Sequence, residues 1–317
     1  EQCCWACVKC EDYEFLPNET ACIDCGEGMW PYPNRSSCYN ISSARLQYMR
    51  WTSAYAVVPV VFATLGIVGT LFVIVTETPV VKASGRELSY MLLIAMIMCY
   101  MMTFVLLAKP SKISCAIKRT GIGFAFSCLY SALLVKTNRI ARIFSKTPRT
   151  AIRPICISPL SQLALCGLLA GFQLFYSVVW LIIIPAGVRH VHPTRAEVVL
   201  TCNIPDHHFL YSLVYIAALI ILCTYYAVKT RRVPENFNET KFIGFTMYTT
   251  CVLWLTWIFF FIGTGNDFQI QTSSLCIAIS MSANAALICI FSPKIWIILF
   301  EKHKNVRKPD GEYMLKR

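Results

Sequence analysis

Long apolar stretches alternate along the chain with short segments that carry most of the charged residues. A helix needs about 20 apolar residues to cross the hydrocarbon core of a bilayer. Stretches of roughly that length, each free of Asp, Glu, Lys and Arg, span residues 52–75, 88–108, 120–135, 155–188, 209–228, 242–266 and 268–293. This pattern predicts an all-α membrane protein built around a bundle of seven transmembrane helices.

The third stretch is the shortest, and the last two nearly merge. Lys118 and Arg119 at one end and Lys136 at the other can extend their charged groups toward the interfaces, so the third helix can continue past both ends of the stretch. Gly263, Gly265 and Asn266 predict a turn between the last two helices. Two helices with a tight connection therefore fit better than one very long span.

Composition agrees with a membrane protein. The chain is 56% hydrophobic and 15% charged, and its mean hydropathy is +0.55. The formal charge of +12 could indicate nucleic-acid binding, but no basic stripe with interleaved aromatic residues accompanies it. Basic residues at membrane boundaries serve topology and anionic lipid instead.

The distribution of basic residues and of glycosylation sequons predicts the orientation. With the N-terminus outside, most of the 29 Lys and Arg residues fall in the cytoplasmic segments. Acceptor sequons lie at Asn18, Asn34 and Asn40, in the segment that would then be extracellular. A further sequon, at Asn238, would face the cytoplasm and stay unmodified. We therefore expect a multi-pass plasma-membrane protein with a cytoplasmic C-terminus.

The first fifty residues are dense in cysteine. Small modules with little hydrophobic core are stabilised by disulfides, and paired CxxC motifs can alternatively bind zinc. The flanking sequons favour disulfides. Because the number of cysteines is odd, at least one needs a partner outside this chain, which suggests missing upstream sequence. The cysteines are Cys3, Cys4, Cys7, Cys10, Cys22, Cys25 and Cys38.

Two further cysteines are expected on the outer side. Cys115 precedes the third helix and Cys202 lies in the long loop before the fifth, so both face an oxidising environment and can pair. The expected organisation is a disulfide-rich extracellular module at 1–50, a seven-helix domain at 51–300 and a cytoplasmic tail at 301–317.

The chain lacks the residues that several classes of function require. The chain has no GxSxG, HExxH or Walker motif and no acidic pair within the spans, so we expect no enzyme, cofactor or metal. A transporter usually carries ionisable residues at mid-membrane, and these spans have none. Lys294 lies at a helix end, unlike a retinal-binding lysine, and the DRY and NPxxY signatures of rhodopsin-like receptors are missing.

Several runs resemble the metabotropic glutamate receptors, a group of class C G-protein-coupled receptors. The match extends over nearly the whole chain, and CCWACVKC is similar to the end of that family's cysteine-rich linker. The resembling runs are TPVVKASGREL (78–88), YSALLVKTNRIARIF (130–144), ISPLSQ (157–162), VPENFNETKFIGFTMYTTC (233–251) and FSPKIWIILF (291–300).

The resemblance implies an architecture and a function. Family members have a bilobed amino-acid-binding domain, a cysteine-rich linker and seven helices, and they work as dimers. We therefore expect a receptor that transmits extracellular amino-acid binding, that of L-glutamate, to heterotrimeric G proteins of the inhibitory type. The alternatives are a class C receptor for another amino acid or small amine, and a seven-helix transporter or channel.

The resemblance also implies disulfide partners. Cys10 should pair with Cys22, and Cys25 with Cys38. Cys3 would reach the missing binding domain, and Cys4 and Cys7 would bond to linker cysteines upstream.

At the inner face, the resemblance implies a lock between Lys136 and Glu239 that holds the receptor inactive. The alternative interpretation is that Lys136 and Glu239 are two solvated loop charges without a functional contact. Five residues of the inner loops are candidate G-protein contacts, although the basic ones among them also fit simple positive-inside signals. The candidate contacts are Ser84, Arg86, Arg139, Arg142 and Phe144.

Within the bundle, a few polar groups in aromatic surroundings have the composition of a small-molecule cavity. Ordinary packing is the alternative, because Trp and Tyr on membrane helices mostly fill the core or the interface. The resemblance implies an allosteric modulator site at several of these positions. The candidates are Tyr130, Thr250, Trp254, Trp257 and Ser280.

Overall fold

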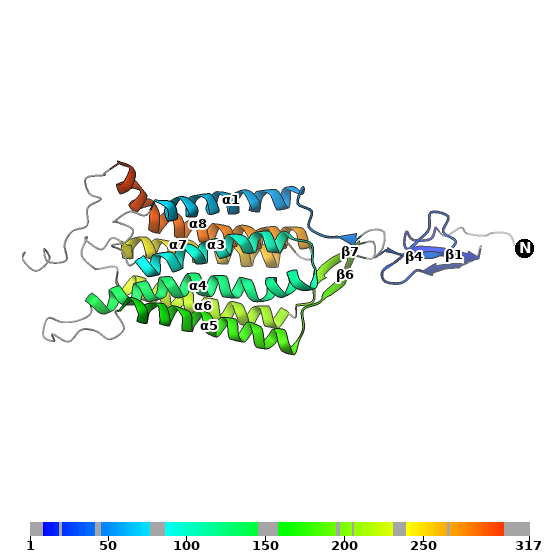
Figure 1. The fold of residues 1–317 in the computed structure, drawn as a ribbon. Helices are drawn as coiled ribbons and strands as arrows, with labels where there is room; N and C mark the ends of the chain where they lie inside the picture. Colours follow the sequence, from blue (N-terminus) through cyan, green and yellow to red (C-terminus); the bar gives the residue numbers. More distant parts are fainter. Residues whose placement is uncertain are drawn as a thin grey trace, which may run out of the picture.

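The structure is a computed structural model of the 317-residue chain. It describes residues 9–18, 21–41, 46–76, 86–144, 158–194, 197–204, 206–230, 239–264 and 267–300. A helix bundle forms most of the molecule, and a small strand-rich module stands at the N-terminal end of the chain (Figure 1).

The predicted seven-helix bundle is confirmed. Among the described residues, seven helices are long and apolar enough to cross a membrane. Consecutive helices run in opposite directions, up and down the bundle (Figure 1). The helices are α1 (Ala54–Val75), α3 (Arg86–Leu107), α4 (Lys112–Phe144), α5 (Pro159–Ile183), α6 (Asp206–Lys229), α7 (Glu239–Gly263) and α8 (Phe268–Phe300).

Three helices differ most from the expected spans, and one of them, α8, continues to Phe300 rather than ending at residue 293. The helix α4 has 33 residues and extends well beyond 120–135 at both ends, as the charged residues there allow. The helix α5 begins at Pro159, after the N-cap Ser158 whose side chain accepts a hydrogen bond from the backbone of Ser161. It ends at Ile183 rather than continuing to residue 188.

The helix α4 is the most buried of the seven and packs against α3, α5 and α6. Its side chains supply much of the core, including the fully buried Phe126, Leu129 and Tyr130. The helices α1, α5, α6 and α7 expose many large apolar side chains. Such residues are stable against lipid tails, so these helices form the outer surface of the bundle.

Polar contacts join α1, α3 and α8 inside the bundle. The Tyr100 hydroxyl donates to Oδ1 of Asn284 at 2.8 Å, and Nδ2 of Asn284 donates to the Phe62 carbonyl at 3.3 Å. Thr103 and Ser280 share a hydrogen bond of 2.9 Å. Buried polar groups in a membrane need partners within the protein, so these bonds fix how the three helices face one another.

Gly66 on α1 allows the close approach of the Tyr100 ring, because a Cβ there would overlap that ring. Gly66→Ala is therefore expected to lower the free energy of unfolding by about 2 kcal/mol, the typical cost of overpacking. Gly167→Ala on α5 is the matched control, since nothing lies within 4 Å of its added Cβ. Thermal unfolding in detergent measures both. Equal midpoints for the two variants would contradict the close packing of α1 on α3.

The N-terminal module consists of two antiparallel hairpins, in which β1 (Glu14–Asn18) pairs with β2 (Ala21–Asp24) and β3 (Met29–Pro31) with β4 (Cys38–Asn40). Disulfides join Cys10 to Cys22 and Cys25 to Cys38. Few of its side chains are fully buried; Ile41 is one. The module therefore depends on its disulfides more than on a hydrophobic core.

Candidate functional site

A three-stranded sheet connects the module to the bundle. The strand β5 (Leu46–Gln47) lies just before α1 and pairs in parallel with β7 (Glu197–Cys202), which pairs antiparallel with β6 (Val188–Thr194). The β6–β7 hairpin joins α5 to α6 and extends from the bundle toward the module (Figure 1). We call the end of the bundle that carries this hairpin the module end, and the opposite end the far end.

The module also touches the hairpin directly. Gly28 has a φ of +75°, a conformation that favours glycine. A Cβ on Gly28 would lie 2.9 Å from the Nε2 atom of His192 on β6. The module backbone therefore packs against the hairpin without space for a larger residue.

A disulfide continues this connection into the bundle. Cys202, the last residue of β7, is bonded to Cys115 in the first turns of α4, with Cα atoms 5.4 Å apart. A series of contacts thus runs from Gly28 of the module through β6 and β7 to α4.

Two adjacent basic residues on α4 bind the C-terminal ends of α3 and α5. Lys118 donates to the Ala108 carbonyl at the end of α3, at 3.1 Å. Arg119 donates to the carbonyls of Trp180 (3.1 Å) and Ile184 (2.6 Å) at the end of α5. Helix C-termini carry partial negative charge and unpaired carbonyls, so cations stabilise them.

A cavity of about 1590 Å³ lies at the module end, bounded by α4, α5, α6 and α7 and by the β6–β7 hairpin, with contributions from α3 and α8. Of the predicted pocket residues, Trp254 and Trp257 line it. Tyr130, Thr250 and Ser280 are at most 1% exposed and do not line it. Ser280 instead bonds to Thr103, as described above.

An aromatic series connects the deep residues to the cavity. Tyr130 stacks on Phe126 at 5.8 Å between ring centroids, Phe126 meets the edge of Trp254 at 5.3 Å, and Trp254 contacts Trp257 at 5.6 Å. The structure therefore brings Tyr130, Trp254 and Trp257 together. A ligand in the cavity would contact the tryptophans directly and reach Tyr130 through Phe126.

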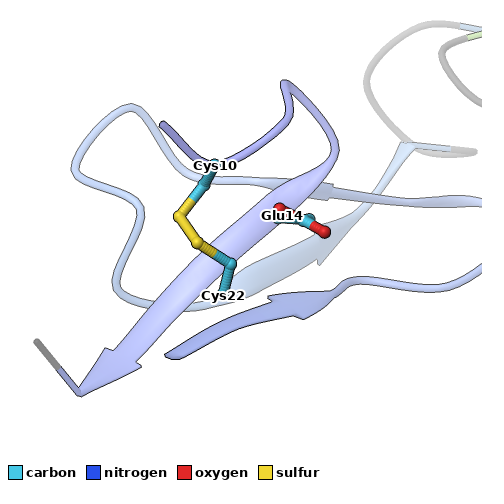
Figure 2. A group of neighbouring side chains, drawn as sticks. All are labelled: Cys10, Glu14 and Cys22. Carbon is cyan, nitrogen blue, oxygen red and sulfur yellow. A yellow bond between two sulfur atoms is a disulfide. The ribbon is translucent and has the colours of Figure 1, made fainter. Parts of the chain in front are cut away.

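Side chains near Cys10 could be mistaken for a metal site. The ligand atoms of Cys10, Glu14 and Cys22 lie within 4.8 Å of one another (Figure 2). However, both sulfur atoms belong to the Cys10–Cys22 disulfide and are not thiolates. Glu14 accepts a hydrogen bond from the backbone of Glu11. This arrangement favours a disulfide-bonded module over the zinc interpretation.

At the far end, the basic candidates gather at the ends of α3 and α4. Arg86 begins α3 and forms an ion pair with Glu87 at 3.8 Å. Arg142 is exposed and donates to Oδ1 of Asn138 at 3.2 Å. Arg139 is half-buried, and Phe144 ends α4. These residues therefore share one end of the bundle, opposite the module.

The two lock residues also lie at the far end. Lys136 is only 4% exposed, and Glu239 begins α7, with a side chain outside the described part. Their pairing stays a prediction. Ser84, Cys3, Cys4 and Cys7 lie outside the described residues. Asn18, Asn34 and Asn40 are exposed on the module, and their glycosylation also stays a prediction.

The sequence analysis missed the β6–β7 hairpin and the cavity rim that it forms. The available signal was the β-branched character of the two segments, with Val188, Val191 and Thr194 in one and Val198, Val199 and Thr201 in the other.

Comparison with known proteins identifies the family. A family model described as "7 transmembrane sweet-taste receptor of 3 GCPR" matches residues 49–294. The chain is 70% identical to the "Probable metabotropic glutamate receptor mgl-1" of Caenorhabditis elegans over 100% of its own length and 32% of that protein. It is 49% identical to the "Metabotropic glutamate receptor" of Drosophila melanogaster, over 97% of its length and 32% of that protein.

The chain thus spans about a third of the length of these relatives. The matched region includes all seven helices and the hairpin, and the relatives at 70% and 49% identity are both named as receptors. The resemblance stated from the sequence is confirmed, and an enzyme is excluded by the family. The chain belongs to the class C family of G-protein-coupled receptors and comprises its seven-transmembrane domain with a short disulfide-bonded segment before it.

Proposed function

We propose that this chain is the transmitting part of a metabotropic glutamate receptor, with the module end extracellular and the far end cytoplasmic. Binding of L-glutamate by an upstream domain would change the position of the module, and the bundle would pass that change to a heterotrimeric G protein. The observation that carries the proposal is the series of contacts from Gly28 of the module through β6, β7 and the Cys115–Cys202 disulfide to α4.

The mechanism depends on stiffness. A two-state bundle shifts its population only as far as the input favours one state. A flexible connection would absorb the movement of the module, whereas backbone pairing and a disulfide transmit that movement to α4. We further propose that the receptor acts as a homodimer, in which rotation of one module against the other supplies the input.

The far end would receive the G protein. Four of the candidate contacts lie at this end: Arg86, Arg139, Arg142 and Phe144. Ser84, outside the described residues, comes two positions before the start of α3 in the sequence. Exposed arginines suit contacts with acidic or carbonyl groups of a partner. We propose an inhibitory G protein, on the resemblance of KTNRIARIF (136–144) to relatives of that type.

Nucleotide exchange tests this function. The full receptor that contains this chain is reconstituted in lipid nanodiscs with an inhibitory heterotrimer, and GTP analogue uptake is measured with and without L-glutamate. Glutamate-dependent uptake supports the proposal. In a parallel experiment in liposomes, glutamate-dependent solute flux without nucleotide exchange would favour the transporter or channel. Exchange driven by another amino acid or amine, but not by glutamate, would keep the class C mechanism and overturn the ligand.

Lys136 provides a prediction about the inactive state. A lysine that is 4% exposed is costly unless its charge is compensated, so we propose that it pairs with Glu239 when the receptor is inactive. Lys136→Met should release that restraint and raise glutamate-independent nucleotide exchange several-fold. Lys229→Met is the matched control, because Lys229 is an exposed lysine at the same end of the bundle. Basal exchange that is unchanged in Lys136→Met would rule out the lock.

We also propose that the cavity at the module end is a modulator site. Trp254 and Trp257 would contact the ligand, while Tyr130, Thr250 and Ser280 lie behind them and would respond to it. A ligand there lies between α4 and α7, so it can favour one relative position of these helices over another.

A further inference from the structure

We propose that the cavity binds an amphipathic anion, with its carboxylate or phosphate at the module end and its apolar body against the tryptophans. This inference rests on the modulator site proposed above and adds the chemical class of its ligand. It follows from the kinds of side chain that line the cavity at each depth.

The wall on the side of α6, α7 and α8 is mostly apolar, with Ser212 and Gln271 as its polar members. It includes Trp254 and Trp257, which present large flat surfaces suited to an acyl chain or an aromatic ring. The aliphatic residues around them are Ile216, Ile220, Leu255, Ile258 and Leu275. A fully polar ligand would gain little there.

The rim at the module end is cationic. Lys118, Arg119 and Arg189 line it together with His192, and no Asp or Glu is among the described residues that line the cavity. Lys118 and Arg119 bond to helix carbonyls, but each retains further N–H donors. Basic side chains beside an apolar volume of low dielectric favour an anion and repel a cation.

Four buried polar atoms around the cavity strengthen the requirement for an acceptor. Nε1 of Trp254, Nε1 of Trp257, Oγ1 of Thr201 and the hydroxyl oxygen of Tyr176 belong to residues that line the cavity, are buried within the wall and have no hydrogen-bond partner in the described part of the chain. Trp257 is 6% exposed, and an indole N–H can only donate. Buried donors are normally paired. Once these side chains turn toward a ligand, its oxygen acceptors would satisfy them, whereas a hydrocarbon such as a sterol ring system would not.

A series of probes with one chain length tests the charge preference. Dodecanoate, dodecanol and dodecylamine are each titrated onto the full chain in phosphatidylcholine nanodiscs, and displacement of a radiolabelled dodecanoate is measured. We expect dodecanoate to bind at least about tenfold more tightly than dodecanol, and dodecylamine not to compete. Dodecanol or dodecylamine binding as tightly as dodecanoate would overturn the proposal.

Variants localise the site. Arg189→Gln on the exposed face of β6 should weaken dodecanoate binding several-fold and leave dodecanol unchanged; Lys118→Gln should do the same if it folds. Lys112→Gln is the matched control, because this exposed lysine begins α4 outside the cavity. A loss of dodecanoate binding that is equal in Lys112→Gln and Arg189→Gln would indicate nonspecific surface charge and overturn the proposal.

A second experiment distinguishes a membrane lipid from a soluble amphiphile as the natural source of the anion. Replacing part of the phosphatidylcholine with phosphatidylglycerol should displace dodecanoate if a membrane lipid headgroup occupies the cavity, and should not if the ligand is a soluble amphiphile. Both results support an anionic ligand. Because binding is measured without a G protein, the outcome is independent of the nucleotide-exchange test of receptor function.

Discussion

Cys202→Ser is expected to abolish most glutamate-driven nucleotide exchange while leaving glutamate binding to the upstream domain intact. The Cys115–Cys202 disulfide is the covalent connection between β7 and α4. It closes a loop with a sequence separation of 87 residues, for which the chain-entropy model gives a stabilisation of about 4 to 5 kcal/mol. Without it, the hairpin can follow the module while α4 does not, and the response should fall at least about tenfold. Ligand binding, surface expression and exchange are measured on the same preparation.

The controls separate lost transmission from general misfolding. Cys115→Ser and the double variant should match Cys202→Ser, because all three remove one bond. Cys289→Ser alters a free cysteine in α8 and should retain the full response. Normal exchange in Cys202→Ser at normal surface expression would sink the proposed route of transmission.

Gly28→Ala should weaken the same route from the module side. The substitution has two costs: a φ of +75° that side chains rarely adopt, and a Cβ 2.9 Å from Nε2 of His192. Either the exposed His192 side chain or the module must shift to relieve the contact; because a shift of the module loosens its packing on the hairpin, we expect the glutamate concentration for half-maximal exchange to rise about tenfold. Dose–response curves of nucleotide exchange measure this.

Gly26→Ala is a closely matched control. Gly26 has a φ of +83°, but nothing lies within 4 Å of its added Cβ. Both variants therefore carry similar backbone strain, and only one of them disturbs the hairpin. His192→Ala combined with Gly28→Ala should restore part of the response. Equal curves for Gly26→Ala and Gly28→Ala would show that the contact with the hairpin does not transmit the signal.

The helices were predictable because their signal is local. An apolar run bounded by charges needs no knowledge of partners, and each of the seven runs corresponds to a helix. The ends of α4 and α5 were less accurate. The helix α4 does continue past Lys118 and Arg119, as expected, but their charged groups bond to neighbouring helix-end carbonyls instead of reaching the interface.

The sheet at the module end was harder to predict because its pairing is distant in sequence. Leu46 pairs with Val198 and Gln47 with Val199, and two residues of strand give almost no pattern of their own. The cavity had the same difficulty. Aromatic composition pointed to Trp254 and Trp257, but Arg189 and His192 reach the rim only because the hairpin folds over it. Tyr130, Thr250 and Ser280 are buried and do not line the cavity.

The bonds from Lys118 and Arg119 to the ends of α3 and α5 limit which helices can move independently. Tilting α4 alone would break three charge-assisted hydrogen bonds at one end of the bundle. The helices α3, α4 and α5 should therefore travel as one rigid block. The helix α7 contacts α4 only slightly and packs mainly on α8 and α6, so sliding between this block and α7 is the least costly deformation of the receptor.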